Sequence, residues 1–145
     1  MTNPLYVVPV DGSDNSNRAV DYAVALAKKT GASLFIPHAI SLGGFRAASA
    51  LDMVEQPADK DMEEKYALEN ILQPAQAKAE AAGVKAETWQ GWGNPARLVQ
   101  EQAKKKDADM VIMGRSGHGS ITELVIGGVS NALVHHSDLP VMLVP

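Results

Sequence analysis

Residues Asp109–Asn131, DMVIMGRSGHGSITELVIGGVSN, hold the pattern on which the fold prediction rests. An apolar run, Met110–Met113, ends in a glycine, and a glycine pair at Gly127 and Gly128 follows where a helical pattern begins. A buried strand, a glycine-containing loop and a helix N-terminus in this order bring backbone N–H groups close to an anion. Glycines after strands also serve only to turn the chain, so the spacing alone leaves both interpretations open.

Composition indicates one globular domain, which we expect to span residues 1–145. Hydrophobic residues make up 46% of the chain and charged residues 21%, a balance typical of folded proteins. The net charge of −4 gives no basic surface of the kind that binds nucleic acid or an acidic membrane, so neither is expected as a partner. The chain has no cysteine, which excludes disulfides, thiolate metal sites and a cysteine nucleophile.

Membrane and targeting signals are absent from the sequence pattern. No apolar run approaches the roughly 18 residues that a membrane-spanning helix needs. The first residues, MTNPLYVVPVDG, lack the basic region of a signal peptide and have the pattern of a strand. The default expectation is therefore a cytoplasmic protein.

Five short strand patterns alternate with helical patterns along the chain, and in one of them, Val84–Trp89, the two faces alternate. The predicted strands are Leu5–Val10, Ala32–Ile40, Val84–Trp89, Met110–Met113 and Leu139–Val144. Continuous apolar runs suit strands buried on both faces, and their alternation with helices predicts a mostly parallel sheet. The fold class is therefore α/β, an open sheet with helices on both faces. In such sheets ligands bind at the carboxyl ends of the strands, where the strand order reverses.

The stretch between the second and third strands carries two proline signals. Residues 41–57 have the pattern of a loop, which includes Pro57. A long helical pattern follows over Asp59–Ala82, and Pro74 lies inside it. Because proline cannot donate the helical hydrogen bond, a kink or break is expected near Ile71–Gln73.

Glycines supply the first part of the candidate site. Gly114 and Gly117 lack a Cβ, so a ribose or phosphate could lie against bare backbone there. Gly127 and Gly128 fall where the last helix starts, so their N–H groups have no acceptor within the helix. A helix N-terminus adds positive potential worth up to about 1 kcal/mol for an exposed anion.

Polar side chains supply the second part. Ser116 and Ser130 carry hydroxyls that can donate to the same anion, and Arg115 is the nearby cation. Asp11, at the end of the first strand, can accept from a base amino group or a ribose hydroxyl. Each has an ordinary structural role as an alternative, since Asp11 also suits a turn or a helix cap and Arg115 suits a solvated surface.

Several well-known catalytic and cofactor motifs are missing. There is no G-x-x-x-x-G-K-[ST] loop, no G-x-G-x-x-G after the first strand and no G-x-S-x-G elbow. The histidines do not have a metal-ligand spacing, so no protein metal site is predicted. No side chain suggests a general base or nucleophile, and no catalytic residue is predicted. Gly91-Trp92-Gly93-Asn94-Pro95 has the pattern of a tight turn. Partial burial accounts for Trp89 and Trp92, the tryptophans near this turn, better than base stacking.

Together these pieces resemble the universal stress protein family over nearly the whole chain. The matching stretches are VVPVDGSDNSNRAVDYA, the strand ending in His38-Ala39-Ile40, Gly93-Asn94-Pro95, and ADMVIMGRSGHG with LVIGGVSNALVHHSDLPVMLV. The resemblance implies a Rossmann-like five-stranded parallel sheet in the order 3-2-1-4-5. It also implies a homodimer, formed through the C-terminal strand.

The nucleotide-binding branch of the family carries G-x-x-G, nine residues, then G-[ST]. Gly114, Gly117 and Gly127 match this pattern, whereas Gly128 stands where the family usually has Ser or Thr. By the resemblance, Asp11 lies on the adenine side and Ala39 contacts adenine through its backbone. The nucleotide-binding residues expected in full are Pro9, Val10, Asp11, Ala39, Met113, Gly114, Arg115, Ser116, Gly117, Gly127, Gly128, Val129 and Ser130.

The resemblance implies an ATP-binding stress-response protein that acts as a nucleotide-dependent regulator or sensor toward an unknown regulatory partner. ADP or AMP could replace ATP, with or without Mg²⁺. One alternative is enzymatic, namely slow ATP hydrolysis or autophosphorylation on Ser116, Ser120 or Ser130. The other is a nucleotide-free dimeric interaction module, in which Gly128 marks a decayed site.

Overall fold

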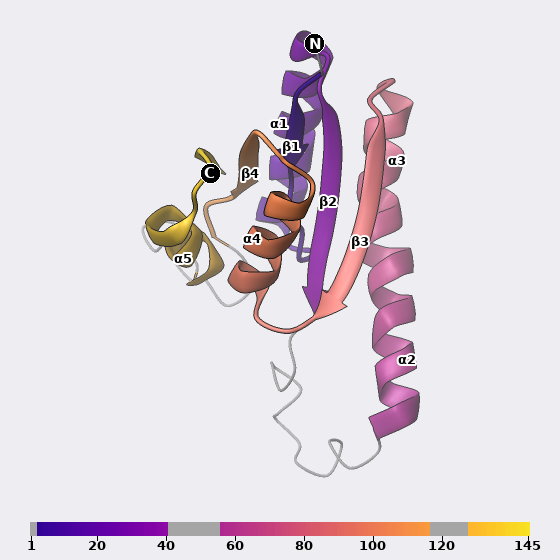
Figure 1. The fold of residues 1–145 in the computed structure, drawn as a ribbon. Helices are drawn as coiled ribbons and strands as arrows, with labels where there is room; N and C mark the ends of the chain where they lie inside the picture. The colour runs from indigo at the N-terminus through magenta and orange to yellow at the C-terminus, as the bar shows by residue number, and fades with distance from the viewer. Residues whose placement is uncertain (1–2, 41–55, 117–127) are drawn as a thin grey trace.

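The computed structural model describes residues 3–40, 56–116 and 128–145, which form one parallel sheet with helices on both faces (Figure 1). The sheet order is β3-β2-β1-β4-β5, as the resemblance implied. The strands are β1 (Leu5–Val7), β2 (Ser33–Ile40), β3 (Ala86–Trp92), β4 (Met110–Gly114) and β5 (Val141–Val144). The helices are α1 (Asp14–Thr30), α2 (Gln56–Ala67), the π-helix η3 (Leu68–Leu72), α3 (Gln73–Ala81), α4 (Pro95–Lys105) and α5 (Gly128–His136).

Strand β1 is shorter than the apolar run Leu5–Val10 predicted. The amides of Val8 and Val10 still donate to the carbonyls of Phe35 and Pro37 in β2. Amides alternate in direction along a strand, so residue 9 is the one that faces β4. Because that residue is proline, it has no hydrogen to donate, and regular pairing with β4 ends at Val7.

Strand β3 is displaced toward the C-terminus from its predicted bounds, Val84–Trp89. It begins at Ala86 and runs through Gly91 and Trp92, residues that the sequence pattern assigns to a turn. Gly91 and Trp92 pair in register with the last two residues of β2. Glycine normally weakens a strand, but here long pairing with β2 keeps it regular.

The expected irregularity before Pro74 is a π turn. Residues Leu68–Leu72 widen the helix by one residue, and the amide of Gln73 donates to the carbonyl of Leu68. This turn lies directly before the residue that cannot donate a helical hydrogen bond. Helix α2 starts earlier than predicted, at Gln56, so Pro57 lies in a first helical turn, where proline is tolerated, and not in a loop.

The two faces of the sheet carry separate apolar clusters. One cluster joins β1 and β2 to α1, η3 and α3, and it includes Val10, Ile36 and Leu72. The other lies beneath α4 and α5 and includes Phe35 and Met113. The central strands β1, β2 and β4 thus bury residues on both faces, as continuous apolar runs predict, whereas β3 and β5 at the sheet edges are mostly partly exposed. Among the described residues, no helix is both long and apolar enough to cross a membrane.

Helix ends follow the local sequence signals. Ser13 caps α1 by accepting from the amide of Ser16, and Asn94 caps α4 by accepting from Arg97. Gly31 ends α1 in the left-handed conformation, at φ 77°. Helix α4 ends with the same geometry, but Asp107 holds the left-handed position at φ 54°. The amides of Asp107 and Ala108 donate to the carbonyls of Lys104 and Ala103, which is a Schellman motif.

Replacing Asp107 with glycine should stabilise the protein. A left-handed conformation costs an L-residue about 1–2 kcal/mol, less for Asp than for most, and glycine adopts it freely. We expect Asp107→Gly to raise the free energy of unfolding by about 0.5–1 kcal/mol in urea denaturation. Asp107→Ala, which removes the same carboxylate and keeps a Cβ, is the control and should not stabilise. A gain for both variants would assign the effect to charge and contradict the backbone explanation.

Candidate functional site

Asn15, in the first turn of α1, holds together the ends of two strands. Its side chain is buried, with 6% of its surface exposed. The Nδ2 group donates to the carbonyl of Val144 at the end of β5, at 2.9 Å. The Oδ1 atom accepts from the amide of Ser116 at 2.6 Å and from its hydroxyl at 3.2 Å. One amide side chain therefore fixes the exit of β4 against α1 and β5.

Gly114 makes this arrangement possible. A Cβ built on Gly114 would lie 2.5 Å from Oδ1 of Asn15 and 3.1 Å from its backbone oxygen. Distances this short leave no room for any side chain at position 114. The glycine that the sequence reading associated with a ligand is thus required by α1 of the protein itself.

The start of α5 lies against the end of β4. The hydroxyl of Ser130, which is 3% exposed, donates to the carbonyl of Gly114 at 2.7 Å. Gly128, the first residue of α5, is exposed, and a Cβ built on it would meet nothing within 4 Å. The first amides of the helix therefore lie next to the β4 exit, and the helix supplies no acceptors for them.

Asp11 shapes the turn between β1 and α1. Its Oδ1 atom accepts from the amide of Ser13 at 2.9 Å, and its own amide donates to the hydroxyl of Ser16 at 3.3 Å. This is the turn role that the sequence reading left open beside the ligand role. Gly12 follows with φ 83°, and a Cβ there would lie 3.2 Å from the side chain of Ile71 in η3.

The remaining predicted residues fall on both faces of the sheet. Met113 is buried in the cluster beneath α4 and α5, and Val129 packs against that cluster. Ala39, near the end of β2, is partly exposed, as is Pro9. Val10 is different, because its side chain is buried in the opposite cluster, beneath α1. Its amide donates to Pro37, and its carbonyl lies 2.7 Å from Nδ1 of His38.

Arg115 is the described cation at the β4 exit. Its amide donates to the carbonyl of Val144 at 2.8 Å. The Nε atom of its side chain is buried, and within the described part of the chain nothing accepts its hydrogen. Gly117 and Gly127, the other glycines of the pattern, lie outside the described residues. The described residues also contain no group of three or more His, Cys, Asp or Glu side chains that could hold a metal ion.

The comparison with known proteins decides the family. The universal stress protein family model matches residues 6–145. This chain belongs to the universal stress protein family. A similar relative is the universal stress protein YxiE of Bacillus subtilis, which is 34% identical over 143 residues that cover 95% of this chain and 96% of the relative. The family resemblance predicted from the sequence is confirmed.

Solved structures of family members share the fold. The protein UspA of Lactobacillus plantarum matches with a TM-score of 0.79 at 22% identity, over 100% of this chain and 99% of the other. A universal stress protein in complex with cAMP matches with a TM-score of 0.70 at 28% identity, over 99% and 98% of the two chains. A member from Archaeoglobus fulgidus in complex with dAMP matches with a TM-score of 0.66 at 20% identity, over 99% and 98%.

The role of Asn15 was not predicted from the sequence. Its three hydrogen bonds reach residues 101 and 129 positions away, and no local pattern encodes such distances. A small amide two residues after a helix cap is most simply interpreted as a surface or capping residue. The one available signal is indirect, since a family glycine at position 114 indicates that some group approaches its backbone closely.

Adding a methyl group at position 114 should reveal the Asn15 contact. We expect Gly114→Ala to lower the free energy of unfolding by about 1–3 kcal/mol, because Oδ1 and the α1 backbone must move. Gly128→Ala is the matched control, since a Cβ there meets open space, and its cost should be small. Both are measured by urea denaturation.

The Asn15→Ala background then tests the cause. Removing the side chain of Asn15 opens the space that the new methyl group needs, so Gly114→Ala should cost less in that background. Costs that add without interaction would show that Asn15 is not what excludes a side chain from position 114.

Proposed function

We propose that this protein binds an adenine nucleotide at the carboxyl ends of β1, β2 and β4 and acts as a nucleotide-dependent regulator or sensor. The observation that carries the proposal is the Ser130–Gly114 hydrogen bond, which sets the N-terminus of α5 beside the β4 exit. From β1 the chain continues to β2 and β3 on one side of the sheet, and then to β4 and β5 on the other side. The strand order therefore reverses between β1 and β4, and ligands of open parallel sheets bind at such a point. The family member bound to cAMP, at 28% identity, supports an adenylate as the ligand class.

The donors available to a phosphate are mainly backbone groups. The hydroxyl of Ser116 donates to Asn15, and that of Ser130 donates to Gly114. Both hydroxyls would have to leave protein oxygens before they could bind a phosphate. The buried Nε of Arg115 has no acceptor among the described residues, and the amides that begin α5 have none within their own helix. Backbone amides at a helix N-terminus are sufficient to bind an anion such as phosphate.

In this proposal, the presence or absence of bound nucleotide is what changes the surface that a partner meets. A phosphate bound near Ser116 would change the position of the residues after β4. Asn15 bonds both Ser116 and Val144, so that change would reach the end of β5. Strand β5 is an edge of the sheet, and three of its four residues are partly exposed. A homodimer through this edge therefore remains our prediction, together with ATP as the preferred nucleotide, Mg²⁺ as its companion and a cytoplasmic location.

Equilibrium dialysis tests the proposal directly. The purified protein should bind labelled AMP or ATP saturably, and an excess of the unlabelled nucleotide should displace it. An absorbance spectrum of the protein as purified adds a check for carried nucleotide. Absence of binding at millimolar nucleotide would contradict the proposal and favour a nucleotide-free interaction module.

Restoring a hydroxyl at position 128 should tighten binding. The family usually has Ser or Thr where this chain has Gly128, and open space surrounds the position. One neutral hydrogen bond contributes about 0.5–1.5 kcal/mol, so Gly128→Ser should lower the ATP dissociation constant about 2- to 13-fold. Gly128→Ala, which adds the Cβ without the hydroxyl, is the control. Equal gains from both variants would attribute the effect to helix stability.

A further inference from the structure

The two tryptophans of β3 face opposite sides of the sheet. They lie three residues apart, and successive side chains of a strand alternate between faces. The Nε1 group of Trp92 donates to Oε2 of Glu64 in α2 at 2.7 Å, and Nζ of Lys60 lies 5.3 Å from its ring centroid. Trp89 instead packs against the cluster beneath α4 and α5. Trp92 is thus held by α2, on the face away from α4.

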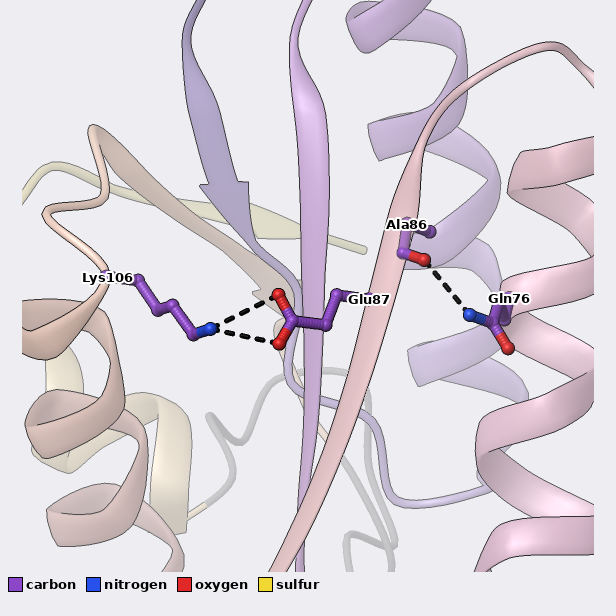
Figure 2. A network of polar contacts seen from close by, with 4 residues as sticks. All are labelled: Gln76, Ala86, Glu87 and Lys106. Carbon is purple, nitrogen blue, oxygen red and sulfur yellow. Dashed lines mark hydrogen bonds and ion pairs between the residues drawn. The ribbon is translucent and has the colours of Figure 1, made fainter.

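Glu87 marks the face to which Trp89 belongs. Figure 2 shows the Glu87 side chain pointing to Lys106, at the end of α4, while Gln76 of α3 lies on the other side of the strand. The Lys106–Glu87 ion pair has a closest distance of 2.9 Å. Trp89 follows Glu87 by two residues, so it projects to the same face. That face also holds Met113 and Val129, two residues of the candidate site.

The indole of Trp89 lies along β3 over Gly91. A Cβ built on Gly91 would lie 2.4 Å from Cη2, 2.8 Å from Cζ2 and 3.1 Å from Cζ3 of Trp89. These three atoms belong to the six-membered ring, so this ring covers the backbone of Gly91 and extends toward the carboxyl end of the strand. Only a residue without a Cβ permits this position.

Gly91 pairs in register with Ala39 of β2. Paired residues of neighbouring strands project to the same face, and the strands lie roughly 5 Å apart. The six-membered ring therefore lies about one strand spacing from Ala39. Trp89, Gly91 and Ala39 are all partly exposed. An aromatic surface thus borders the residue to which the adenine contact was assigned.

We propose that Trp89, which is partly buried as expected, is also a ligand-binding residue, whose indole forms a stacking surface for the purine base. This inference rests on the proposed nucleotide binding and adds the group that recognises the base. Every nucleobase has a π-face, and stacking on an aromatic side chain is a common means of holding one. Gly91 is then a positioning residue, since it lets the ring lie flat along the strand.

Intrinsic fluorescence separates the two tryptophans, which are the only ones in the chain. In Trp92→Phe, the remaining Trp89 emission should change on titration with AMP, with the same dissociation constant that dialysis gives. In the matched variant Trp89→Phe, the Trp92 emission should stay constant. Ribose 5-phosphate, which has no base, should leave the Trp89 emission unchanged.

A binding readout tests the same residue without fluorescence. Trp89→Leu keeps an apolar side chain but removes the ring, and it should weaken AMP binding about 5- to 150-fold. Its binding of ribose 5-phosphate should change less than twofold, which a general loss of folding could not produce. Bound AMP without a Trp89 response, or with a Trp92 response, overturns the stacking role alone. No AMP bound by the unaltered protein overturns the proposed function as well.

Discussion

The carboxamide of Asn15 is the interaction on which the candidate site depends. An amide has both a donor and an acceptor, and here the two point to different strands, since Nδ2 bonds β5 and Oδ1 bonds the residue after β4. Burial raises the cost of leaving any of these groups unpaired. These bonds therefore fix the start of α1, the exit of β4 and the end of β5 relative to one another. The hydrogen bond from Ser130 to Gly114 then places the start of α5 against the end of β4.

The order of the sheet explains why one side chain can do this. Strand β1 lies at the centre, and the helix that follows it packs against β4 and β5. Asp11 and Ser13 make the turn into that helix with local hydrogen bonds. Ile71, from the π turn, packs on the same turn from the other side. The irregular helix before Pro74 is thus part of what supports the loop after β1.

Local signals were predictable from the sequence, and distant ones were not. Asn94 as a cap and Gly31 as a helix end are encoded within a few residues, so their roles could be read directly. The strand order came from the family resemblance, because spacing does not say which strands are neighbours. Gly91 shows the opposite case. It reads as a turn residue, yet pairing with Ala39 and the indole of Trp89 place it inside a strand. Ala39 is distant in the sequence, and Trp89 covers Gly91 only once the strand has formed, so neither constraint could be predicted from the local pattern.

Gly114 and Gly128 both belong to the glycine pattern, but the surrounding structure requires glycine at only one of these positions. At position 114 the space for a Cβ is filled by Asn15, so the glycine would be needed even in a protein without a ligand. At position 128 a Cβ would meet nothing within 4 Å, so packing does not require glycine there. A match at Gly114 is therefore a sign of the fold as much as of a nucleotide. What points to a binding site in this chain is the pair of donor groups beside the β4 exit. The first amides of α5 have no acceptor within the helix, and the buried Nε of Arg115 has none among the described residues.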